Sequence, residues 1–464
     1  MKKVLIIASI FPPNKCVGRV RTVKFAKYLP SFGWKPVVLT TTTYHLTEKE
    51  RDFRLLEEVP SYVKVYRALR LPLLANWVYL LKKIRKNYRR KKKNTKKIDA
   101  SKKYNNRKKL RKLIGGLINK VEEFLNRFVL IPDNNIVWLL FAVAKGIYII
   151  KKEKIDLIFS TAPAYTDHLI GCILKILTRK PWIADYRDLW NEDPSRYWIG
   201  KFRRRIEKKI EKYVILQANL IVVVSLPMRD IIIQNFLRDK REQEKIIVIS
   251  NGFDPQDICI PYESTEKQKD KFVITYTGKI GYCKTFSALR CFLEALAKVI
   301  NEDPSLKKKI RVRFIGEIAN RRKEEIFNFI RKFNLQEVVE FREWCSNRRC
   351  LIEQRESDVL LLMIGSSMNN HIILTTKLFE YITATRPILA LIPEGAAKEV
   401  ISKTSTGIVV DPNNIEEIKE AIFMLYNQWR EDGLDIYPNW KFIEKFNRKY
   451  LTQKLAEVFS YVCK

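Results

Sequence analysis

The sequence contains little histidine, cysteine or glycine, with 3, 8 and 15 of these residues among 464. The cysteines include no C-x-x-C pair, and the closest two, Cys345 and Cys350, have no histidine near them. A metal site is therefore not expected, and free thiols in a reducing compartment are the default. The chain also lacks a G-x-G-x-x-G fingerprint and a Walker lysine motif, which argues against a nicotinamide dehydrogenase and a P-loop ATPase.

Long hydrophobic runs are absent too. The first apolar run, Val4–Phe11, ends in two prolines without a small-residue cleavage site, so it predicts a buried strand rather than a signal peptide. Val137–Ile150 is interrupted by Lys145 and is shorter than the roughly 20 apolar residues of a spanning helix. We therefore expect a cytoplasmic protein that does not span a membrane but can lie on one.

What the chain does contain is apolar residues, at 46%, and positive charge. That apolar content excludes a largely disordered protein, and 464 residues suit two domains of about 200 residues each. Lys and Arg outnumber Asp and Glu by 88 to 51, and a net charge of +37 favours anionic partners such as nucleic acid, anionic lipid or a phosphorylated substrate. The block Lys82–Lys112 holds 18 Lys and Arg residues against one acid, Asp99. It is either a solvated insertion or a membrane contact.

The first half of the chain alternates short apolar runs with helical periodicity. Strands are predicted at Val4–Ser9, Pro36–Thr41, Asp156–Ser160, Trp182–Asp185 and Leu220–Ser225, and helices at Val20–Leu29, ending before Gly33, and at His168–Leu177. Such alternation indicates a parallel sheet with helices on both faces.

A second series follows Ser250-Asn251-Gly252. Strands are predicted at Phe272–Thr277, Val312–Ile315, Val338–Phe341, Val359–Met363, Ile388–Leu391 and Gly407–Val410, with helices at Thr285–Ile300, Lys323–Phe333, Lys377–Thr383 and Ile415–Val462. The predicted fold is α/β, with two Rossmann-like doubly wound parallel-sheet domains facing a cleft that holds the ligand. The domains are residues 1–250, with the basic insertion at 82–112, and residues 251–430. A helical segment, 431–464, is expected to pack back toward the first domain.

Two loops of the first half carry candidate site residues. In Phe11–Arg19, F-P-P-N-K-C-V-G-R, Gly18 is either an ordinary turn glycine or a residue that lets backbone N–H groups approach an anion at a helix N-terminus. In Ser160–His168, S-T-A-P-A-Y-T-D-H, the histidine is either a helix-surface residue or a ligand contact.

A third loop, D-Y-R-D-L-W, begins at Asp185 at the end of a strand. Charged residues at such a strand end either pair with one another or meet a ligand. Arg187 can therefore pair with Asp185 or Asp188, or Arg187 and Asp188 can contact a substrate.

In the second half, Thr277-Gly278-Lys279 ends a strand, and Lys284 follows five residues after Lys279. A glycine followed by a lysine suits a phosphate, because the backbone can approach closely and the lysine supplies a point charge. Lys377 and Glu380 lie one helical turn apart in Leu374–Leu391. They are either a capping pair or a pair in which the glutamate accepts two ribose hydroxyls.

Five motifs stand in order along the chain: K-V-L-I-I-A-S-I-F-P-P at the start, D-Y-R-D-L-W, S-N-G-F-D at Ser250–Asp254, T-G-K, and T-K-L-F-E-Y at Thr376–Tyr381. Together they resemble glycosyltransferase family 4, and in particular the bacterial members that build surface polysaccharides. The resemblance covers nearly the whole chain except Lys82–Lys112.

This resemblance implies the GT-B architecture, a nucleotide diphosphate sugar as donor, retention of anomeric configuration, and no required metal or cofactor. The donor would lie mainly on the C-terminal half. Glu380 would bind the donor ribose, Lys279 and Lys284 the diphosphate, and Gly18 would face the donor phosphates and the acceptor. Lys377 is a further donor-binding candidate.

The sequence also departs from the family pattern. Many members carry two glutamates eight positions apart, whereas here Ile372 precedes Glu380. Many carry a histidine followed by aspartate where Arg187-Asp188 stands here. The catalytic candidates are therefore Asp188, Arg187 and His168. Lys279 and Lys284 are one residue closer in sequence than the corresponding lysines of the family pattern.

The predicted function is a hexosyltransferase-like enzyme that transfers sugar to a glycan or lipid-linked acceptor. We expect it to be peripheral on the inner face of the plasma membrane, attached to anionic lipid through Lys82–Lys112, without a nucleic-acid partner. Two alternatives remain. One is a nucleic-acid-binding protein that uses the basic surface, although no helix-turn-helix, RNA-recognition or zinc-finger pattern is present. The other is a non-catalytic, sugar-binding relic of a GT-B enzyme.

Overall fold

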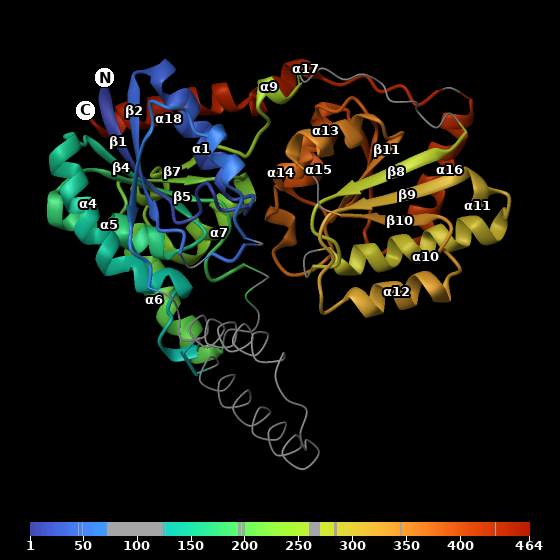
Figure 1. The fold of residues 1–464 in the computed structure, drawn as a ribbon, viewed down its shortest axis with the longest axis horizontal. Helices are drawn as coiled ribbons and strands as arrows, with labels where there is room; N and C mark the ends of the chain where they lie inside the picture. The colour runs from blue at the N-terminus through green and yellow to red at the C-terminus, as the bar shows by residue number, and fades with distance from the viewer. Residues whose placement is uncertain are drawn as a thin grey trace, which may run out of the picture. The chain divides into compact units, whose positions relative to one another are not determined.

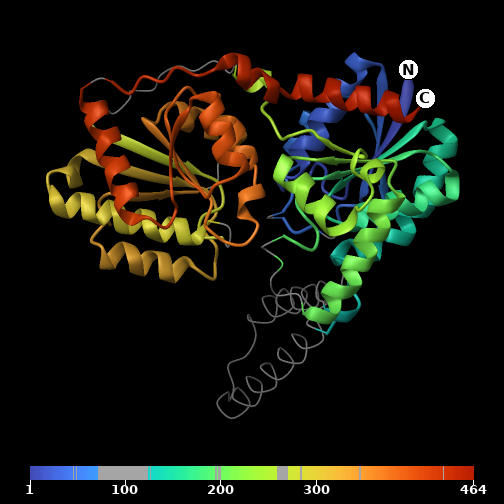
Figure 2. The same ribbon diagram turned by 180° about the vertical axis from the view of Figure 1, so that it is seen from behind.

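The computed structural model describes residues 1–44, 46–48, 50–71, 124–125, 127–193, 196, 200–258, 270–282, 285–343, 346–431 and 433–464. The chain divides into two compact units (Figures 1 and 2). The first comprises Met1–Asn191, Trp198–Val222 and Val458–Lys464, and the second Glu192–Tyr197 and Val223–Glu457. The basic block Lys82–Lys112 and the candidate Lys284 lie outside the described residues.

The first sheet has seven strands in the order β3-β2-β1-β4-β5-β6-β7. They are β1 (Lys2–Ile7), β2 (Trp34–Thr41), β3 (Lys64–Ala68), β4 (Leu157–Ala162), β5 (Trp182–Tyr186), β6 (Leu220–Val223) and β7 (Ile246–Val248). β1 runs parallel to β2 on one side and to β4 on the other, with Val4 opposite both Pro36 and Leu157. The strand order reverses there, so the loops after β1 and β4 lie where ligands bind in open α/β sheets.

Helices follow most of these strands. They are α1 (Arg19–Tyr28), α4 (Leu139–Glu153), α5 (Thr166–Thr178), α6 (Lys201–Gln217), α7 (Leu226–Phe236) and α8 (Lys240–Gln243), with 3₁₀ turns η1 (Leu29–Phe32), η2 (Phe53–Glu58) and η3 (Asn134–Trp138). Gly33 ends η1 with a φ of 82°, a left-handed conformation that glycine adopts at no steric cost. One helical stretch, Asn134–Glu153, is long and apolar enough to cross a membrane by length and composition alone. Its α4 part packs against α5 and β2.

The second sheet repeats the same winding with six strands in the order β10-β9-β8-β11-β12-β13. They are β8 (Phe272–Thr277), β9 (Ile310–Ile315), β10 (Val339–Arg342), β11 (Val359–Met363), β12 (Ile388–Leu391) and β13 (Gly407–Val410). All five neighbouring pairs are parallel. The prediction of two doubly wound parallel sheets is therefore confirmed.

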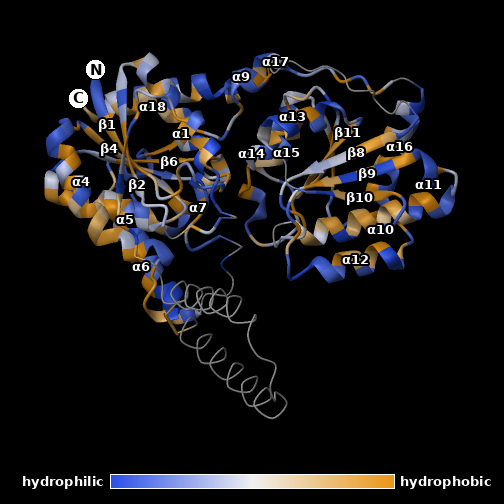
Figure 3. Ribbon diagram, in the orientation of Figure 1, coloured by the Kyte–Doolittle hydropathy of each residue, from blue (hydrophilic) through white to orange (hydrophobic). Residues whose placement is uncertain are grey.

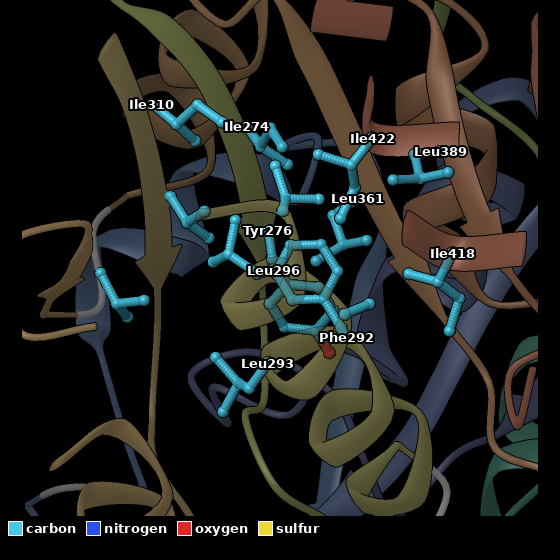
Figure 4. Packing of buried hydrophobic residues seen from close by; sticks show 14 of the residues in the cluster. Ile274, Tyr276, Phe292, Leu293, Leu296, Ile310, Leu361, Leu389, Ile418 and Ile422 are labelled. Atoms are coloured by element: carbon cyan, nitrogen blue, oxygen red, sulfur yellow. The ribbon is translucent and has the colours of Figure 1, made fainter. Parts of the chain in front are cut away.

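The helices of the second half are α9 (Pro255–Ile258), α10 (Phe286–Glu302), α11 (Leu306–Lys309), α12 (Lys323–Lys332), α13 (Asn347–Arg355), α14 (Thr376–Tyr381), α15 (Ala396–Thr404), α16 (Ile415–Arg430), α17 (Trp440–Ile443) and α18 (Arg448–Val462), with 3₁₀ turns η5 (Asn370–Ile372) and η6 (Glu444–Phe446). The core beneath α10 and α16 joins Ile274 and Tyr276 of β8 to Phe292 of α10 and Ile418 of α16 (Figure 4). Hydrophobic colour is concentrated on the strands and alternates with polar colour on α10 and α12 (Figure 3), as expected of amphipathic helices over a buried sheet.

The stretch predicted to be helical, Ile415–Val462, contains α16, α17 and α18, but it is interrupted. α16 ends at Arg430, and residues 433–439 are not helical before α17 begins. Gly433 and Pro438 lie in this segment, and both residue types are unfavourable in a helix interior. The helical periodicity of the sequence therefore continues across a segment in which the helix is interrupted.

Candidate active site

The short helix α14 presents the candidate donor residues of the second unit. The Thr375 side chain caps its N-terminus by accepting a hydrogen bond from the Leu378 backbone N–H at 3.3 Å. Phe379 and Tyr381 are buried, and the Phe379 ring packs 5.1 Å from that of Phe446. These contacts fix the helix, while Lys377 and Glu380 stay partly exposed.

Lys377 lies over an aromatic ring at the end of β8. Its Nζ is 3.6 Å from the centre of the Tyr276 ring, and no ion-pair or hydrogen-bond partner is found for it among the described residues. Burial lowers its pKa from 10.5 to about 7, against the opposing attraction of Glu380. The charged form of Lys377 is therefore poorly hydrated, and a nearby anion would favour it.

Gly278 makes room for this lysine. A Cβ on Gly278 would lie 3.0 Å from both the Cε and the Nζ of Lys377, and the glycine has a φ of 121°, which L side chains rarely adopt. The backbone conformation therefore favours glycine in the T-G-K motif, and a larger residue would also displace the end of the Lys377 side chain. Lys279, the next residue, is exposed, and its Nζ lies 5.1 Å from the centre of the Tyr282 ring.

Glu380 is linked to the end of β8 through Gln354 on α13. The Gln354 Nε2 donates to the Thr277 Oγ1 at 3.1 Å and, more weakly, to the Glu380 Oε2 at 3.5 Å. The Tyr381 hydroxyl accepts a hydrogen bond from the Thr277 backbone N–H at 2.9 Å. Burial raises the pKa of Glu380, and Gln354 opposes this effect. The result is a carboxylate whose oxygens are available to accept hydrogen bonds from a ligand's hydroxyls.

In the first unit, Arg187 bonds to three backbone carbonyls rather than to a carboxylate. Its Nε donates to Ala162 at 3.0 Å, its Nη2 to Pro163 at 2.7 Å, and its Nη1 to Gly18. A Cβ on Gly18 would lie 2.9 Å from this Nη1, and the φ of Gly18 is −53°, which any residue can adopt. The absence of a side chain at Gly18 therefore leaves the space that Arg187 occupies. The Arg187 guanidinium joins the loop after β1 to the loop after β4.

The predicted alternative of an Arg187–Asp185 pair is replaced by a different pair. Asp185 accepts two hydrogen bonds from Arg21 of α1, at 3.1 and 2.8 Å, and one from the Thr161 hydroxyl at 2.6 Å. Both partners of this ion pair are buried. Asp188, two residues beyond β5, is partly exposed.

His168 lies in the core of the first unit with none of its surface exposed. Its Nδ1 is 2.8 Å from the Ser160 Oγ, which also accepts a hydrogen bond from the Trp182 indole at 2.8 Å. Burial lowers the pKa of His168 to about 3, so the ring is neutral at physiological pH. The structure thus places His168 apart from the solvent-facing candidates, and Ile372, at the position where the family pattern has a glutamate, is buried as well.

Sequence reasoning missed Asp167, the residue before His168. Its Oδ2 accepts hydrogen bonds from the backbone N–H and the hydroxyl of Ser9, at 2.8 and 2.9 Å, which joins α5 to the end of β1. Burial raises its pKa well above the usual value. Gln354 and Tyr276 were also missed, and neither stands in a motif. Within the described part of the chain, no group of three or more His, Cys, Asp or Glu residues is placed to hold a metal ion.

Each half of the chain contains a region that matches a glycosyltransferase family model. The family model "Glycosyltransferase Family 4" matches residues 118–257, and "Glycosyl transferases group 1" matches residues 271–428. No curated protein matches the sequence.

Solved structures share the fold over the full length at low sequence identity. Sucrose-phosphate synthase from Thermosynechococcus elongatus has a TM-score of 0.64 at 12% identity, and 99% of each chain is covered. A glycosyltransferase from Rickettsia africae has a TM-score of 0.61 at 17% identity, covering 100% of this chain and 99% of the other. HepE from Anabaena, in complex with UDP-glucose, has a TM-score of 0.62 at 15% identity, covering 99% of this chain and 100% of the other. The chain is thus a GT-B glycosyltransferase, with a family 4 region followed by a group 1 region.

Proposed function

We propose that the chain is a retaining, metal-independent hexosyltransferase that takes sugar from a nucleotide diphosphate sugar. The acceptor is a glycan or a lipid-linked intermediate in surface polysaccharide synthesis. The observation that carries this proposal is the arrangement on α14, where Lys377 and Glu380 lie one turn apart and the ammonium lies over the Tyr276 ring. The complex of Anabaena HepE with UDP-glucose, on a similar fold, supports a donor of this class.

The proposed reaction breaks the bond between the anomeric carbon of the sugar and the diphosphate oxygen. A new bond forms to the acceptor hydroxyl, whose proton passes to the departing diphosphate. Negative charge grows on that diphosphate in the transition state, so cations aimed at it stabilise the transition state more than the ground state. Lys377 and Lys279 supply this charge, Lys284 adds to it by the family pattern, and Glu380 accepts the ribose hydroxyls.

The first unit supplies the acceptor side in this proposal. Arg187 acts as a positioning residue, because its guanidinium holds the carbonyls of Gly18, Ala162 and Pro163. Asp188 is the candidate for contact with the acceptor. His168 has no exposed surface, so we assign it a role in holding Ser160 rather than in touching the sugar.

A panel of nucleotide sugars tests this function. The purified chain is incubated with each donor and with lipid-linked acceptors, and mass spectrometry detects a product that is one sugar heavier. NMR of the anomeric proton should show retention, and EDTA should leave the rate unchanged. Lys377→Gln should weaken donor binding, whereas Lys332→Gln, on the exposed part of α12, should not. Absence of binding and turnover with every donor would refute the proposal.

We also propose that the enzyme is peripheral on the cytoplasmic face of the plasma membrane. The support is the block Lys82–Lys112, whose net charge is +17, since each basic residue near an anionic leaflet contributes about 1 kcal/mol at best. Deletion of residues 82–112 should weaken co-sedimentation with anionic vesicles, and added salt should weaken that of the parent chain. Equal binding by the deleted and parent chains would show that this block is not an anchor.

A further inference from the structure

The outward surface of α6 carries positive charge alone. Its exposed charged positions are Lys201, Arg204, Arg205, Lys208, Lys209 and Lys212. The only acids of the helix, Glu207 and Glu211, are buried on the opposite side. There Glu207 accepts hydrogen bonds from Arg203 and from the Trp190 indole, at 2.5 and 2.8 Å, and Glu211 accepts one from Asn191 at 2.6 Å. The two acids of α6 are therefore buried, and its exposed charged side chains are all cations.

Three phenylalanines gather beside the start of this helix. Phe124, Phe128 and Phe202 are 58%, 45% and 61% exposed, and the ring of Phe128 lies 5.2 Å from that of Phe124 and 6.3 Å from that of Phe202. The Arg127 guanidinium lies 5.5 Å from the Phe128 ring. Exposed aromatic rings that gather on one surface mark a site of contact with a partner or a membrane, because single exposed apolar side chains are common but clusters of them are not.

We propose that this α6 surface, the six exposed cations together with Phe124, Phe128 and Phe202, docks on an anionic phospholipid bilayer. The cations meet the lipid phosphates, and the three rings enter the boundary between headgroups and acyl chains. This inference goes beyond the proposed function, because it places membrane contact on described residues of α6 and requires no glycosyl transfer.

The apolar side chains around α6 favour a bilayer over a nucleic acid. α5, which packs against α6, exposes Ile176 and Leu177, and α6 itself exposes Tyr213. Aliphatic side chains suit acyl chains and have no role in base stacking. The phenylalanine rings pack on one another, whereas single-stranded nucleic acid needs ring faces that are free to stack with bases.

The inner face of α6 links docking to the loop after β5. Trp190 and Asn191 follow the Asp185–Leu189 segment directly, and both are held by the buried acids of α6. A bilayer under α6 would therefore hold the loop that carries Arg187 and Asp188 at a fixed distance from the lipid surface. That position suits an acceptor whose lipid end stays in the membrane.

Vesicle co-sedimentation of the full chain tests the surface. The parent should bind vesicles of phosphatidylcholine with phosphatidylglycerol, and should not bind phosphatidylcholine alone. The pair Lys209→Gln and Lys212→Gln should weaken binding about tenfold or more. The pair Lys308→Gln and Lys309→Gln, with the same loss of charge on α11 of the second unit, should bind like the parent.

A second pair tests the rings. Phe124→Ser with Phe202→Ser should weaken binding, whereas Tyr437→Ser, at an exposed site of the second unit, should not. The emission of a Phe202→Trp chain, after subtraction of the parent's emission from its nine tryptophans, should shift to the blue with anionic vesicles and be quenched by brominated lipid. Thermal melts of all variants identify any that unfold, and the pair Lys209→Glu and Lys212→Glu gives an independent check of the charge.

The result that overturns the proposal is parent-like vesicle binding by both the charge and the ring variants. Deletion of residues 82–112 separates the two anchors, since binding that survives the deletion and is lost with the α6 variants supports the α6 surface. Single-stranded RNA serves as the competing ligand. If the parent ignores anionic vesicles and binds RNA through these residues, the surface is a nucleic-acid site and the proposal is wrong.

Discussion

The ammonium of Lys377 and the ring of Tyr276 lie 3.6 Å apart, although a hundred residues separate them in sequence. The contact replaces part of the hydration of the cation with the face of an aromatic ring. That replacement is incomplete, so the pKa of Lys377 falls to about 7. Burial destabilises the positive charge of Lys377, and a bound diphosphate would stabilise it.

Donor affinity should therefore depend on pH in the neutral range. The charged form of Lys377 binds the diphosphate, and because its pKa is lowered, that form is lost above about 7 rather than above 10.5. The Kd of a nucleotide sugar should rise by up to about tenfold per pH unit above this point, and binding should take up a proton. Calorimetry in buffers of different ionisation enthalpy measures both.

The matched variant for this prediction is Lys377→Arg, which stays charged throughout the range. Its Kd should be flat where that of the parent rises. A parent Kd that does not change between about pH 6.5 and 8.5 would contradict the assignment of Lys377 to the diphosphate.

Glu380→Ala should raise the donor KM more than it lowers kcat. A hydrogen bond to a charged group contributes about 2 kcal/mol, which corresponds to about thirtyfold in KM. Pyrophosphate, which lacks the ribose, should inhibit the variant and the parent equally. Glu420→Gln, at an exposed position of α16, is the control. A normal donor KM in Glu380→Ala would remove the ribose role.

Gln354 should act through Glu380 rather than on the substrate. Its amide joins Thr277 to Glu380, so Gln354→Leu removes a donor from the carboxylate and should raise the pKa of Glu380 further. As the pH is lowered, the donor KM of the variant should therefore begin to rise at a higher pH than that of the parent. The pH profile of KM measures this shift, and Gln354→Asn tests rescue by a shorter amide. A shift in melting temperature alone, with an unchanged profile, would leave Gln354 a structural residue.

The strands that sequence predicted best are those buried on both faces. β8 and β11 have the predicted bounds, because every residue in them is apolar or buried and the run ends where the chain turns. β3 was missed because it is an edge strand with Lys64 and Arg67 among its five residues. β7 was missed because it has only three residues. β13 is also a short edge strand, but it was predicted with the right bounds because its four residues carry no charge.

The residues of the candidate site also fall into those that local sequence predicts and those that it does not. Lys377 and Glu380 were found because one helical turn brings them together and both stand in one motif. Gln354 was missed because its link to Glu380 spans two elements, and nothing local to α13 predicts it. The reason for Gly18 was also different from the prediction, since the Arg187 side chain, from the loop after β5 far along the sequence, occupies the space.

Arg187→Lys should destabilise the fold rather than remove a chemical step. The guanidinium spans three carbonyls in two loops, and a lysine ammonium on a more flexible stem cannot reach all three. Loss of two such bonds costs about 3 kcal/mol, visible as a lower melting temperature and urea midpoint. Arg179→Lys, at an exposed site, should melt like the parent. Loss of kcat in Arg187→Lys at unchanged stability would instead show that Arg187 touches the substrate.

The end of α18 should be a major contributor to the stability of the first unit. Phe459 has no exposed surface, and its ring lies 5.3 Å from that of Trp34 on β2 and 5.4 Å from that of Phe159 on β4. The Trp34 indole also donates to the Ser460 hydroxyl at 3.3 Å. Phe459→Ala leaves a cavity between α18 and the sheet and should cost about 3–5 kcal/mol of the free energy of unfolding.

Urea unfolding followed by circular dichroism measures this loss, since the signal reports the helices and strands of the whole chain. Phe459→Leu refills most of the cavity and should recover more than half of the loss. Tyr461→Ala, two residues on and 72% exposed, should change stability by less than about 0.5 kcal/mol. If Phe459→Ala unfolds at the urea concentration of the parent, the end of α18 does not stabilise this sheet, and the packing against Trp34 is energetically neutral.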